Sequence, residues 1–302
     1  MACATDPKLV AMARPTASQR SPADAEGGPS EAAVVAEAVT LAHGRTVALA
    51  DADFELPAGA VSVLVGPNGS GKSTLLHAIA GLMTTASGRL LVHGAAPETV
   101  RRRVAYVLQG TKVNDHMPIT VREVVSMSRY AERGLAGRLR ATDRALVDDA
   151  LERLEIGDLA RRHLVELSGG QRQRVFVAQG LAQASELLLL DEPVSGLDVV
   201  SRARILDVVA EEAAVGRTVV VSTHDLSEAA GADHLLLLAG RVVASGAPAE
   251  VLTAARLSEA YGGRLLRLDG DMVLIDDASH HDHQRHDHQA HDPNAPPRPR
   301  QR

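Results

Sequence analysis

The stretch that most constrains this chain is GPNGSGKST, a glycine-rich segment between two apolar ones. The run AVSVLV precedes it and LLHAIAGLM follows it, an order typical of a buried strand, a loop and a helix. Its spacing matches the G-x-x-x-x-G-K-S pattern of a phosphate-binding loop. The pattern predicts nucleotide-binding roles for Gly66, Pro67, Asn68, Gly69, Ser70, Gly71, Lys72, Ser73 and Thr74.

The chemistry of this loop follows from its residue types. Glycines allow backbone N–H groups to curl around a phosphate, and the positive end of the following helix faces the same charge. Lys72 can reach the β- and γ-phosphates, and the Ser73 hydroxyl can bind Mg²⁺. A glycine turn that only links a strand to a helix is the alternative, but it leaves both residues unexplained. We therefore predict a site for a nucleoside triphosphate.

Composition narrows the class of protein. The formal net charge of −6 argues against a general nucleic-acid binder, so no nucleic-acid partner is expected. The single cysteine, Cys3, rules out a disulfide framework within the chain and fits a reducing compartment. No apolar run approaches the roughly eighteen residues that cross a bilayer. We expect a soluble chain, which at a membrane would depend on another polypeptide for its spans.

The order of the apolar patterns predicts an α/β fold. Short strand-like runs after Val34 indicate an N-terminal antiparallel β layer, and helical spacing over about 115–180 indicates a helical insertion. Apolar strands that alternate with helices then predict a P-loop NTPase core with a mainly parallel sheet. The ordered domain is expected over 33–275, between a disordered leader (1–32) and a disordered tail (276–302).

Two acidic residues end the apolar run LLLLDEP. Asp191 at the end of a buried strand can hold Mg²⁺ through water, and Glu192 can then act as a base or orient the attacking water. Two solvated acids at a strand end are the alternative. Because the run follows a phosphate-binding loop in the same chain, the catalytic interpretation is favoured.

The stretch LSGGQRQRV adds a second anion site. A serine and two glycines at a helix start offer a hydroxyl, free N–H groups and the helix dipole. With this motif the chain resembles the ATP-binding subunits of ABC transporters over about residues 34–265. The resemblance implies the ABC ATPase fold, ATP as the nucleotide and a head-to-tail homodimer. It also implies that one copy contacts the partner's γ-phosphate through Ser168, Gly169 and Gly170, with Gln171 as a further nucleotide-binding residue of this motif.

The resemblance assigns roles to three further positions. Gln109 in YVLQG corresponds to the glutamine near Mg²⁺ and the attacking water, and Asp198 in SGLD to the loop at the dimer interface. His224 in VSTHD corresponds to the switch histidine that contacts the γ-phosphate. The chain departs from the family at His43, where an aromatic residue usually stacks on adenine. An imidazole stacks with less area, so adenine affinity and base selectivity are open at this position.

Two features bear on the cargo. The segment TKVNDHMPITVREVV resembles zinc and manganese importer ATPases, with Met117 in place of the usual aromatic residue. The end of the ordered domain resembles that branch and also the iron-chelate importers. The resemblance implies a metal importer, zinc first and manganese second, on the inner face of the membrane. It implies two partners besides the second copy: an integral membrane permease and an extracytoplasmic metal-binding protein.

The sequence leaves three alternative functions open. An ATPase of an iron-siderophore or haem importer shares all of these motifs. A soluble ABC ATPase that acts on ribosomes or DNA usually has tandem modules or long coiled coils, neither of which is visible here. A metal-storage protein built around the tail would leave the complete ATPase motif set unexplained.

The tail combines histidines with aspartates. Neutral imidazoles in flexible His/Asp arrays suit Zn²⁺, Ni²⁺ or Cu²⁺. A solvated low-complexity tail or a purification tag is the alternative, although the irregular spacing is unlike a standard tag. We predict zinc binding by this tail, with a role in buffering or sensing as a hypothesis, through His280, His281, His283, His286, His288 and His291.

Overall fold

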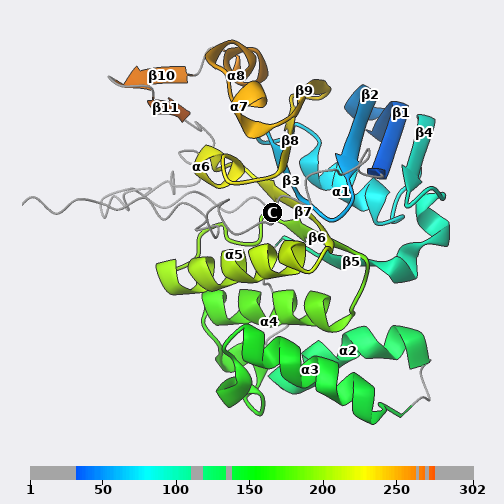
Figure 1. The fold of residues 1–302 in the computed structure, drawn as a ribbon, viewed down its shortest axis with the longest axis vertical. Helices are drawn as coiled ribbons and strands as arrows, with labels where there is room; N and C mark the ends of the chain where they lie inside the picture. Colours follow the sequence, from blue (N-terminus) through cyan, green and yellow to red (C-terminus); the bar gives the residue numbers. More distant parts are fainter. Residues whose placement is uncertain (1–31, 110–117, 134–137, 263–264, 269–271, 276–302) are drawn as a thin grey trace, which may run out of the picture. The chain divides into compact units, whose positions relative to one another are not determined.

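The computed structural model (Figure 1) describes residues 32–109, 118–133, 138–262, 265–268 and 272–275. The chain divides into two compact units, Met1–Gly263 and Arg264–Arg302. The described part of the second unit is an antiparallel hairpin of β10 (Leu265–Leu268) and β11 (Met272–Ile275). Met117, the leader up to residue 31 and the six tail histidines lie outside the described residues. The domain limits expected from the sequence therefore stay predictions.

The first unit contains a six-stranded sheet with the strand order β5-β6-β7-β3-β8-β9. The first five strands are parallel, and β9 pairs antiparallel with β8 at one edge. Every residue of β3, β6 and β7 is buried, as expected for strands that are covered on both faces. The strands are β3 (Val61–Val65), β5 (Val104–Val107), β6 (Leu187–Asp191), β7 (Thr218–Thr223), β8 (His234–Leu238) and β9 (Val242–Gly246).

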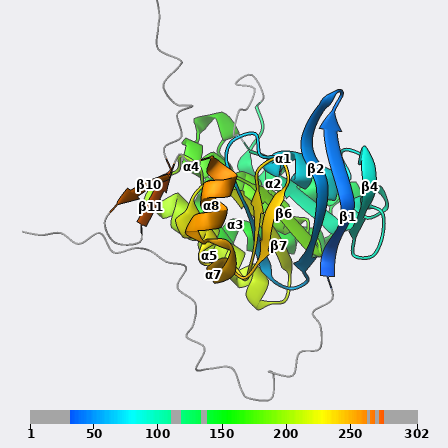
Figure 2. The ribbon, with the colours of Figure 1, turned by 90° about the horizontal axis from the view of Figure 1, so that it is seen from above.

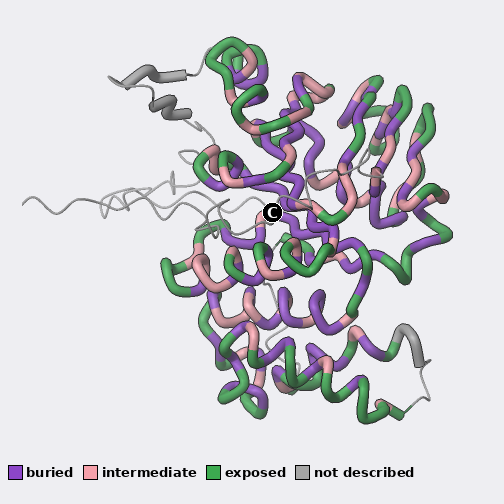
Figure 3. The backbone as a smooth tube through the Cα atoms, in the orientation of Figure 1, coloured by how far each residue is buried: buried purple, intermediate pink, exposed green. Residues whose placement is uncertain are grey.

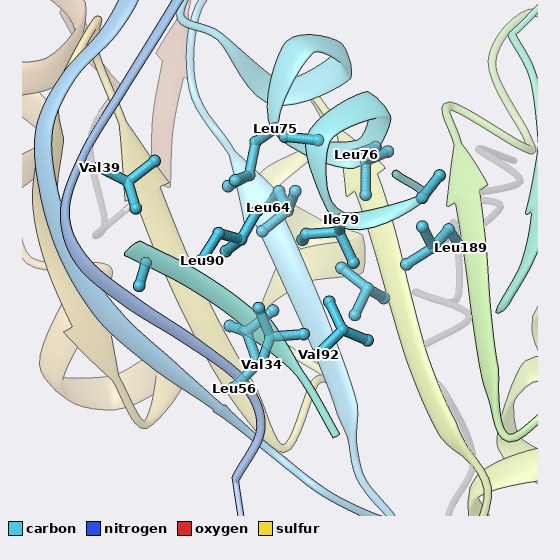
Figure 4. Packing of buried hydrophobic residues seen from close by; sticks show 14 of the residues in the cluster. Val34, Val39, Leu56, Leu64, Leu75, Leu76, Ile79, Leu90, Val92 and Leu189 are labelled. Atoms are coloured by element: carbon cyan, nitrogen blue, oxygen red, sulfur yellow. The ribbon is translucent and has the colours of Figure 1, made fainter. Parts of the chain in front are cut away.

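A second, antiparallel sheet has the order β2-β1-β4. The predicted hairpin is confirmed as β1 (Ala32–His43) and β2 (Thr46–Pro57), and β4 (Ser87–Val92) pairs with the other side of β1. Helix α1 (Lys72–Ile79) contacts all three strands. Figure 4 shows the apolar side chains of α1 packed between the two sheets, with the labelled residues Leu75, Leu76, Ile79, Leu64, Leu189, Val34, Val39, Leu56, Leu90 and Val92.

The predicted helical insertion is a group of three helices that contact one another (Figures 1 and 2). They are α2 (Val121–Arg133), α3 (Ala141–Arg153) and α4 (Gly169–Ala182). Helix α4 also contacts α5 (Val199–Ala214), which in turn contacts β3 and β7 of the parallel sheet. The remaining helices are short: α6 (Leu226–Ala229), α7 (Pro248–Val251) and α8 (Ala254–Tyr261). Figure 3 shows that burial concentrates in the sheet and on the inner faces of these helices.

Over the residues that the structure describes, no helix combines the length and the apolar character that a bilayer crossing requires.

The parallel sheet brings the chemistry-bearing segments to one edge. Val65, the last residue of β3, pairs with Thr223 of β7, and Asp191 at the end of β6 pairs with Ser222. The phosphate-binding loop, the acidic pair and His224 therefore follow the carboxyl ends of neighbouring strands, where parallel α/β sheets bind their ligands. The predicted α/β arrangement is confirmed.

Helix α1 is the centre of the core between the two sheets, which gives a stability prediction. Leu75 is fully buried there, so Leu75→Ala should lower the free energy of unfolding by about 2–5 kcal/mol. The matched control is Leu82→Ala, because the Leu82 side chain is 60% exposed and its loss should change stability by less than ~0.5 kcal/mol. Urea unfolding of both variants measures the difference, and equal effects would contradict this packing.

Candidate functional site

The phosphate-binding loop begins at Gly66 directly after β3, and it ends where α1 starts at Lys72. Glycine is required by close backbone contacts at both ends of the loop. A Cβ on Gly66 would lie 2.1 Å from the carbonyl oxygen of Leu238, and one on Gly71 would lie 2.7 Å from that of Ala48. Gly71 also has a φ of 101°, in the region that L side chains rarely adopt. The sequence therefore fixes a tight loop at the N-terminus of α1.

Lys72 holds its ammonium group against this loop. Its Nζ donates to the carbonyl oxygens of Gly66, at 2.7 Å, and Pro67, at 3.1 Å. The side chain is buried, so its charge is only weakly screened by solvent. A buried cation at the N-terminus of a helix suits an anion, and the triphosphate site here stays a prediction.

His43, the predicted adenine contact, lies beside the same loop. It is the last residue of β1 and is exposed, and its Nε2 lies 3.2 Å from Oγ1 of Thr74 in the first turn of α1. This hydrogen bond joins the antiparallel sheet to the loop helix. Stacking of the imidazole on a nucleotide base stays a prediction.

Asp191 is buried at the end of β6, and each of its two carboxylate oxygens accepts a hydrogen bond. Ser222 Oγ donates to Oδ1 at 2.5 Å, and the Tyr106 hydroxyl donates to Oδ2 at 3.2 Å. Burial, and then the negative charge of Asp191, raise the pKa of Tyr106 well above its usual value. The phenol therefore stays protonated and able to donate.

Glu192 is where the residues predicted to be catalytic meet. Gln109 Nε2 donates to its Oε2 at 2.9 Å, and Nδ1 of His224 lies 3.5 Å from the same oxygen. Glu192 itself has a φ of 44°, uncommon for a residue with a side chain. Its N–H lies 2.9 Å from Oγ and 3.2 Å from the carbonyl oxygen of Ser222, which fixes this conformation. The side chain is mostly buried but reaches solvent.

The donor set at this edge of the sheet fits Mg²⁺. In nucleotide sites this ion is held by one or two carboxylates together with phosphate oxygens, and it prefers oxygen ligands throughout. Asp191 supplies a carboxylate, and half-buried Ser73 supplies a hydroxyl. Gln109 donates through its amide nitrogen to Glu192, so its amide oxygen remains a potential ligand. Within the described part of the chain, no group of three His, Cys, Asp or Glu side chains is arranged to hold a metal ion.

The second predicted anion site begins α4. Ser168 caps this helix: its Oγ accepts from the Gln171 N–H at 3.3 Å, and its own N–H donates to Gln171 Oε1 at 3.0 Å. Asp198 caps α5 in the same way, accepting from the Ser201 N–H at 2.9 Å. The hydrogen bonds from Ser201 hold the pKa of Asp198 below its usual value.

These two helix starts touch. A Cβ on Gly170 would lie 2.4 Å from Asp198 Oδ2 and 2.5 Å from Ser201 Oγ. The structure therefore arranges the predicted residues in two groups. One contains Gln109, Asp191, Glu192 and His224 beside the phosphate-binding loop. The other contains Ser168 to Gln171 and Asp198.

An ion-pair cluster anchors the segment that carries His224. The Arg202 guanidinium lies 2.6 Å from Asp225 and 2.8 Å from Glu228, and Thr223 donates to the other Glu228 oxygen at 2.6 Å. Burial raises the pKa of Glu228. The cluster forms part of the wall of a small pocket, which is lined by Glu192, Val194, Ser195, Gly196, Arg202, Thr223, His224, Asp225 and Glu228.

Sequence reasoning missed three residues of this region, namely Tyr106, Ser222 and Arg202. Tyr106 and Ser222 lie within the motifs YVLQG and VSTHD, but their hydrogen bonds to Asp191 depend on the strand order. Arg202 follows the SGLD motif by four residues on α5, and the acidic residues that it binds lie after His224. A search for oppositely charged residues after each motif could have identified it.

Comparisons with known proteins decide the family. The ABC transporter family profile matches residues 49–195. The zinc transport system ATP-binding protein TroB of Treponema pallidum is 40% identical over 253 residues, 82% of this chain and 95% of TroB. The chain belongs to the ATP-binding subunits of ABC transporters. Membership confirms the predicted family and makes this chain an ATPase.

Other relatives of this ABC ATPase carry related names. The manganese transport system ATP-binding protein MntB of Bacillus subtilis is 38% identical over 239 residues, 79% of this chain and 95% of MntB. The chelated iron transport system membrane protein YfeB of Yersinia pestis is 37% identical over 248 residues, 81% of this chain and 82% of YfeB. The solved structure of cbiO1 from Clostridium perfringens, part of the ABC transporter complex cbiONQ, matches with a TM-score of 0.63 at 27% identity, covering 76% and 93% of the two chains. The predicted ABC ATPase fold is confirmed.

The contact between the starts of α4 and α5 predicts different effects on stability for substitutions at two adjacent glycines. Gly170→Ala should lower the free energy of unfolding by about 1–2 kcal/mol, because the new methyl group displaces the Asp198 cap. Gly169→Ala is the matched control, since a Cβ there meets nothing within 4 Å and the loss of glycine should leave stability unchanged or raise it by up to ~1 kcal/mol. Thermal unfolding of both variants tests this, and the contact is disproved if Gly170→Ala proves as stable as Gly169→Ala.

Proposed function

We propose that this ABC ATPase powers a membrane importer for a transition-metal ion, with zinc as the first candidate cargo and manganese as the second. The relatives named for zinc and manganese transport, at 40% and 38% identity, support this cargo class. The observation that carries the ATPase role is the meeting of Gln109 and His224 at one oxygen of Glu192, beside Asp191 and the phosphate-binding loop.

The phosphate-binding loop and the residues beside it have distinct roles in hydrolysis. Lys72 and the loop N–H groups bind the β- and γ-phosphates. Asp191, Ser73 and Gln109 would hold Mg²⁺, which would supply positive charge to neutralise the phosphates. Glu192 accepts a proton from the attacking water or orients it, and Gln109 and His224 hold the carboxylate that does so.

The second group of predicted residues acts on the nucleotide that is bound by another copy of the chain. In the proposed head-to-tail homodimer, Ser168, Gly169, Gly170 and Gln171 meet the γ-phosphate bound by the partner. Two exposed apolar side chains support a contact surface there. Val199 is 77% and Val200 is 66% exposed, and both directly follow Asp198. A second copy that covers them would remove apolar surface from water.

Closing and opening of this dimer would drive an integral membrane permease, fed by an extracytoplasmic metal-binding protein. The ATPase would then lie on the cytoplasmic face of the membrane, held there by the permease. Leu108, next to Gln109, is 57% exposed, and Met127 on α2 is 47% exposed. Both are candidates for apolar contact with the permease. Co-purification with an integral membrane protein would distinguish this transport role from a soluble ABC ATPase.

The role of Glu192 gives a sharp prediction. Glu192→Gln should lower the rate of ATP hydrolysis by about 10²–10⁴-fold while ATP affinity stays close to that of the unaltered chain, because the amide cannot accept a proton. The matched control is Glu186→Gln, which removes an exposed carboxylate paired with Arg103 and should leave the rate unchanged. Phosphate release and nucleotide binding are measured on both variants. A Glu192→Gln variant that still hydrolyses ATP at the full rate would refute the role.

The cargo is tested in cells that lack this chain. We expect cell zinc to fall in the deletion strain and to recover on expression of the unaltered chain but not of Glu192→Gln. A fall in manganese alone would support the second candidate cargo. A fall in iron alone would instead support an iron-chelate importer, the alternative favoured by the similarity to YfeB.

For the tail, we propose that the six histidines between His280 and His291 bind zinc and adjust ATPase activity to cytosolic metal. The support is their density and their alternation with aspartates in the sequence. Deleting residues 280–291 should remove zinc binding by the purified chain, measured by equilibrium dialysis, and should remove any response of ATP hydrolysis to zinc. Unchanged binding and an unchanged response would disprove the proposal.

A further inference from the structure

Two hydroxyl groups donate hydrogen bonds to the two oxygens of the Asp191 carboxylate. The motifs of the sequence give neither hydroxyl a role. One belongs to Ser222 on β7 and the other to Tyr106 on β5, at 2.5 Å and 3.2 Å from Oδ1 and Oδ2. These are the two strands that flank β6 in the sheet. The carboxylate is thus held from both sides by rigid elements rather than by loops.

The Ser222 hydroxyl makes a second contact. Besides donating to Asp191, its oxygen accepts from the backbone N–H of Glu192 at 2.9 Å. One fully buried hydroxyl therefore sets the geometry of two successive acidic residues. A change at Ser222 should affect both of them.

The Tyr106 ring is itself fixed. It meets the ring of His77 edge to face, with 5.4 Å between centroids and 87° between planes. His77 lies on α1, five residues after Lys72. The ring is thus held by the helix that follows the phosphate-binding loop, and its hydroxyl connects that helix to Asp191.

We propose that Tyr106 and Ser222 are positioning residues that orient the Asp191 carboxylate toward the Mg²⁺ bound with ATP. The inference rests on the metal-binding role proposed for Asp191 above. Hydrogen bonds to a ligating carboxylate fix its orientation, and their loss typically lowers metal affinity by about 10–100-fold. With one bond on each oxygen, the remaining lone pairs of Asp191 are left for the metal or its bound water.

A purely structural role makes a different prediction. If the two hydroxyls only satisfied buried polar groups, their removal would lower stability and leave divalent-ion affinity unchanged. The deciding measurement is therefore an ion-binding constant rather than activity.

The experiment titrates the purified full chain with Mn²⁺, as a paramagnetic substitute for Mg²⁺, in the presence of a non-hydrolysable ATP analogue. Free Mn²⁺ is measured by electron paramagnetic resonance. Tyr106→Phe removes only the hydroxyl and should raise the Mn²⁺ dissociation constant about tenfold, with nucleotide affinity in EDTA unchanged. The matched control is Tyr130→Phe, the same change at an exposed residue of α2, which should bind Mn²⁺ like the unaltered chain.

Two further variants complete the test. Ser222→Ala should raise the Mn²⁺ dissociation constant at least as much as Tyr106→Phe, and where it does not fold, Tyr106→Phe alone decides. Asp191→Asn should lose most Mn²⁺ affinity. If Asp191→Asn is weakened but Tyr106→Phe binds Mn²⁺ normally, this inference is overturned and the role of Asp191 stands. If Asp191→Asn binds Mn²⁺ normally, the proposed metal role of Asp191 is wrong, and the inference falls with it.

Discussion

The pairing of β6 with β7 is the contact on which the site depends. It places Ser222 opposite Asp191, and Ser222 then fixes both the Asp191 carboxylate and the backbone of Glu192. Glu192 occupies a backbone conformation that costs roughly 1–3 kcal/mol, so it persists only where its surroundings stabilise it. The two acidic residues follow each other in sequence, but their carboxylates have different partners. Asp191 is buried among hydroxyl donors, and Glu192 meets Gln109 and His224.

Helix α5 connects the two groups of predicted residues. Its N-terminal cap, Asp198, touches Gly170 at the start of α4, and Arg202 one turn later binds the acidic residues after His224. Arg153 of α3 pairs with buried Glu212 near the other end of α5 at 2.7 Å. Helix α5 therefore contacts the helical insertion and the start of α4, and through Arg202 it pairs with the acidic residues after His224.

Most of the fold was predictable because its signals are local. The loop before Lys72, the buried strand before Asp191 and the serine cap of α4 each occupy a few consecutive residues, and all were confirmed in place. The partners of Asp191 were not predictable in the same way. Tyr106 and Ser222 lie 85 and 31 residues from it, and they meet only because the strand order is β5-β6-β7. Local patterns fix which segments are strands but not which strands are neighbours.

We propose that two copies of the chain enclose ATP between the phosphate-binding loop of one copy and the start of α4 of the other. Analytical ultracentrifugation of the Glu192→Gln chain can detect this dimer, because an undamaged but hydrolysis-deficient site should retain bound ATP. We expect a dimer with ATP and Mg²⁺ and a monomer with ADP. A sedimentation profile that remains monomeric at saturating ATP and Mg²⁺ would contradict it.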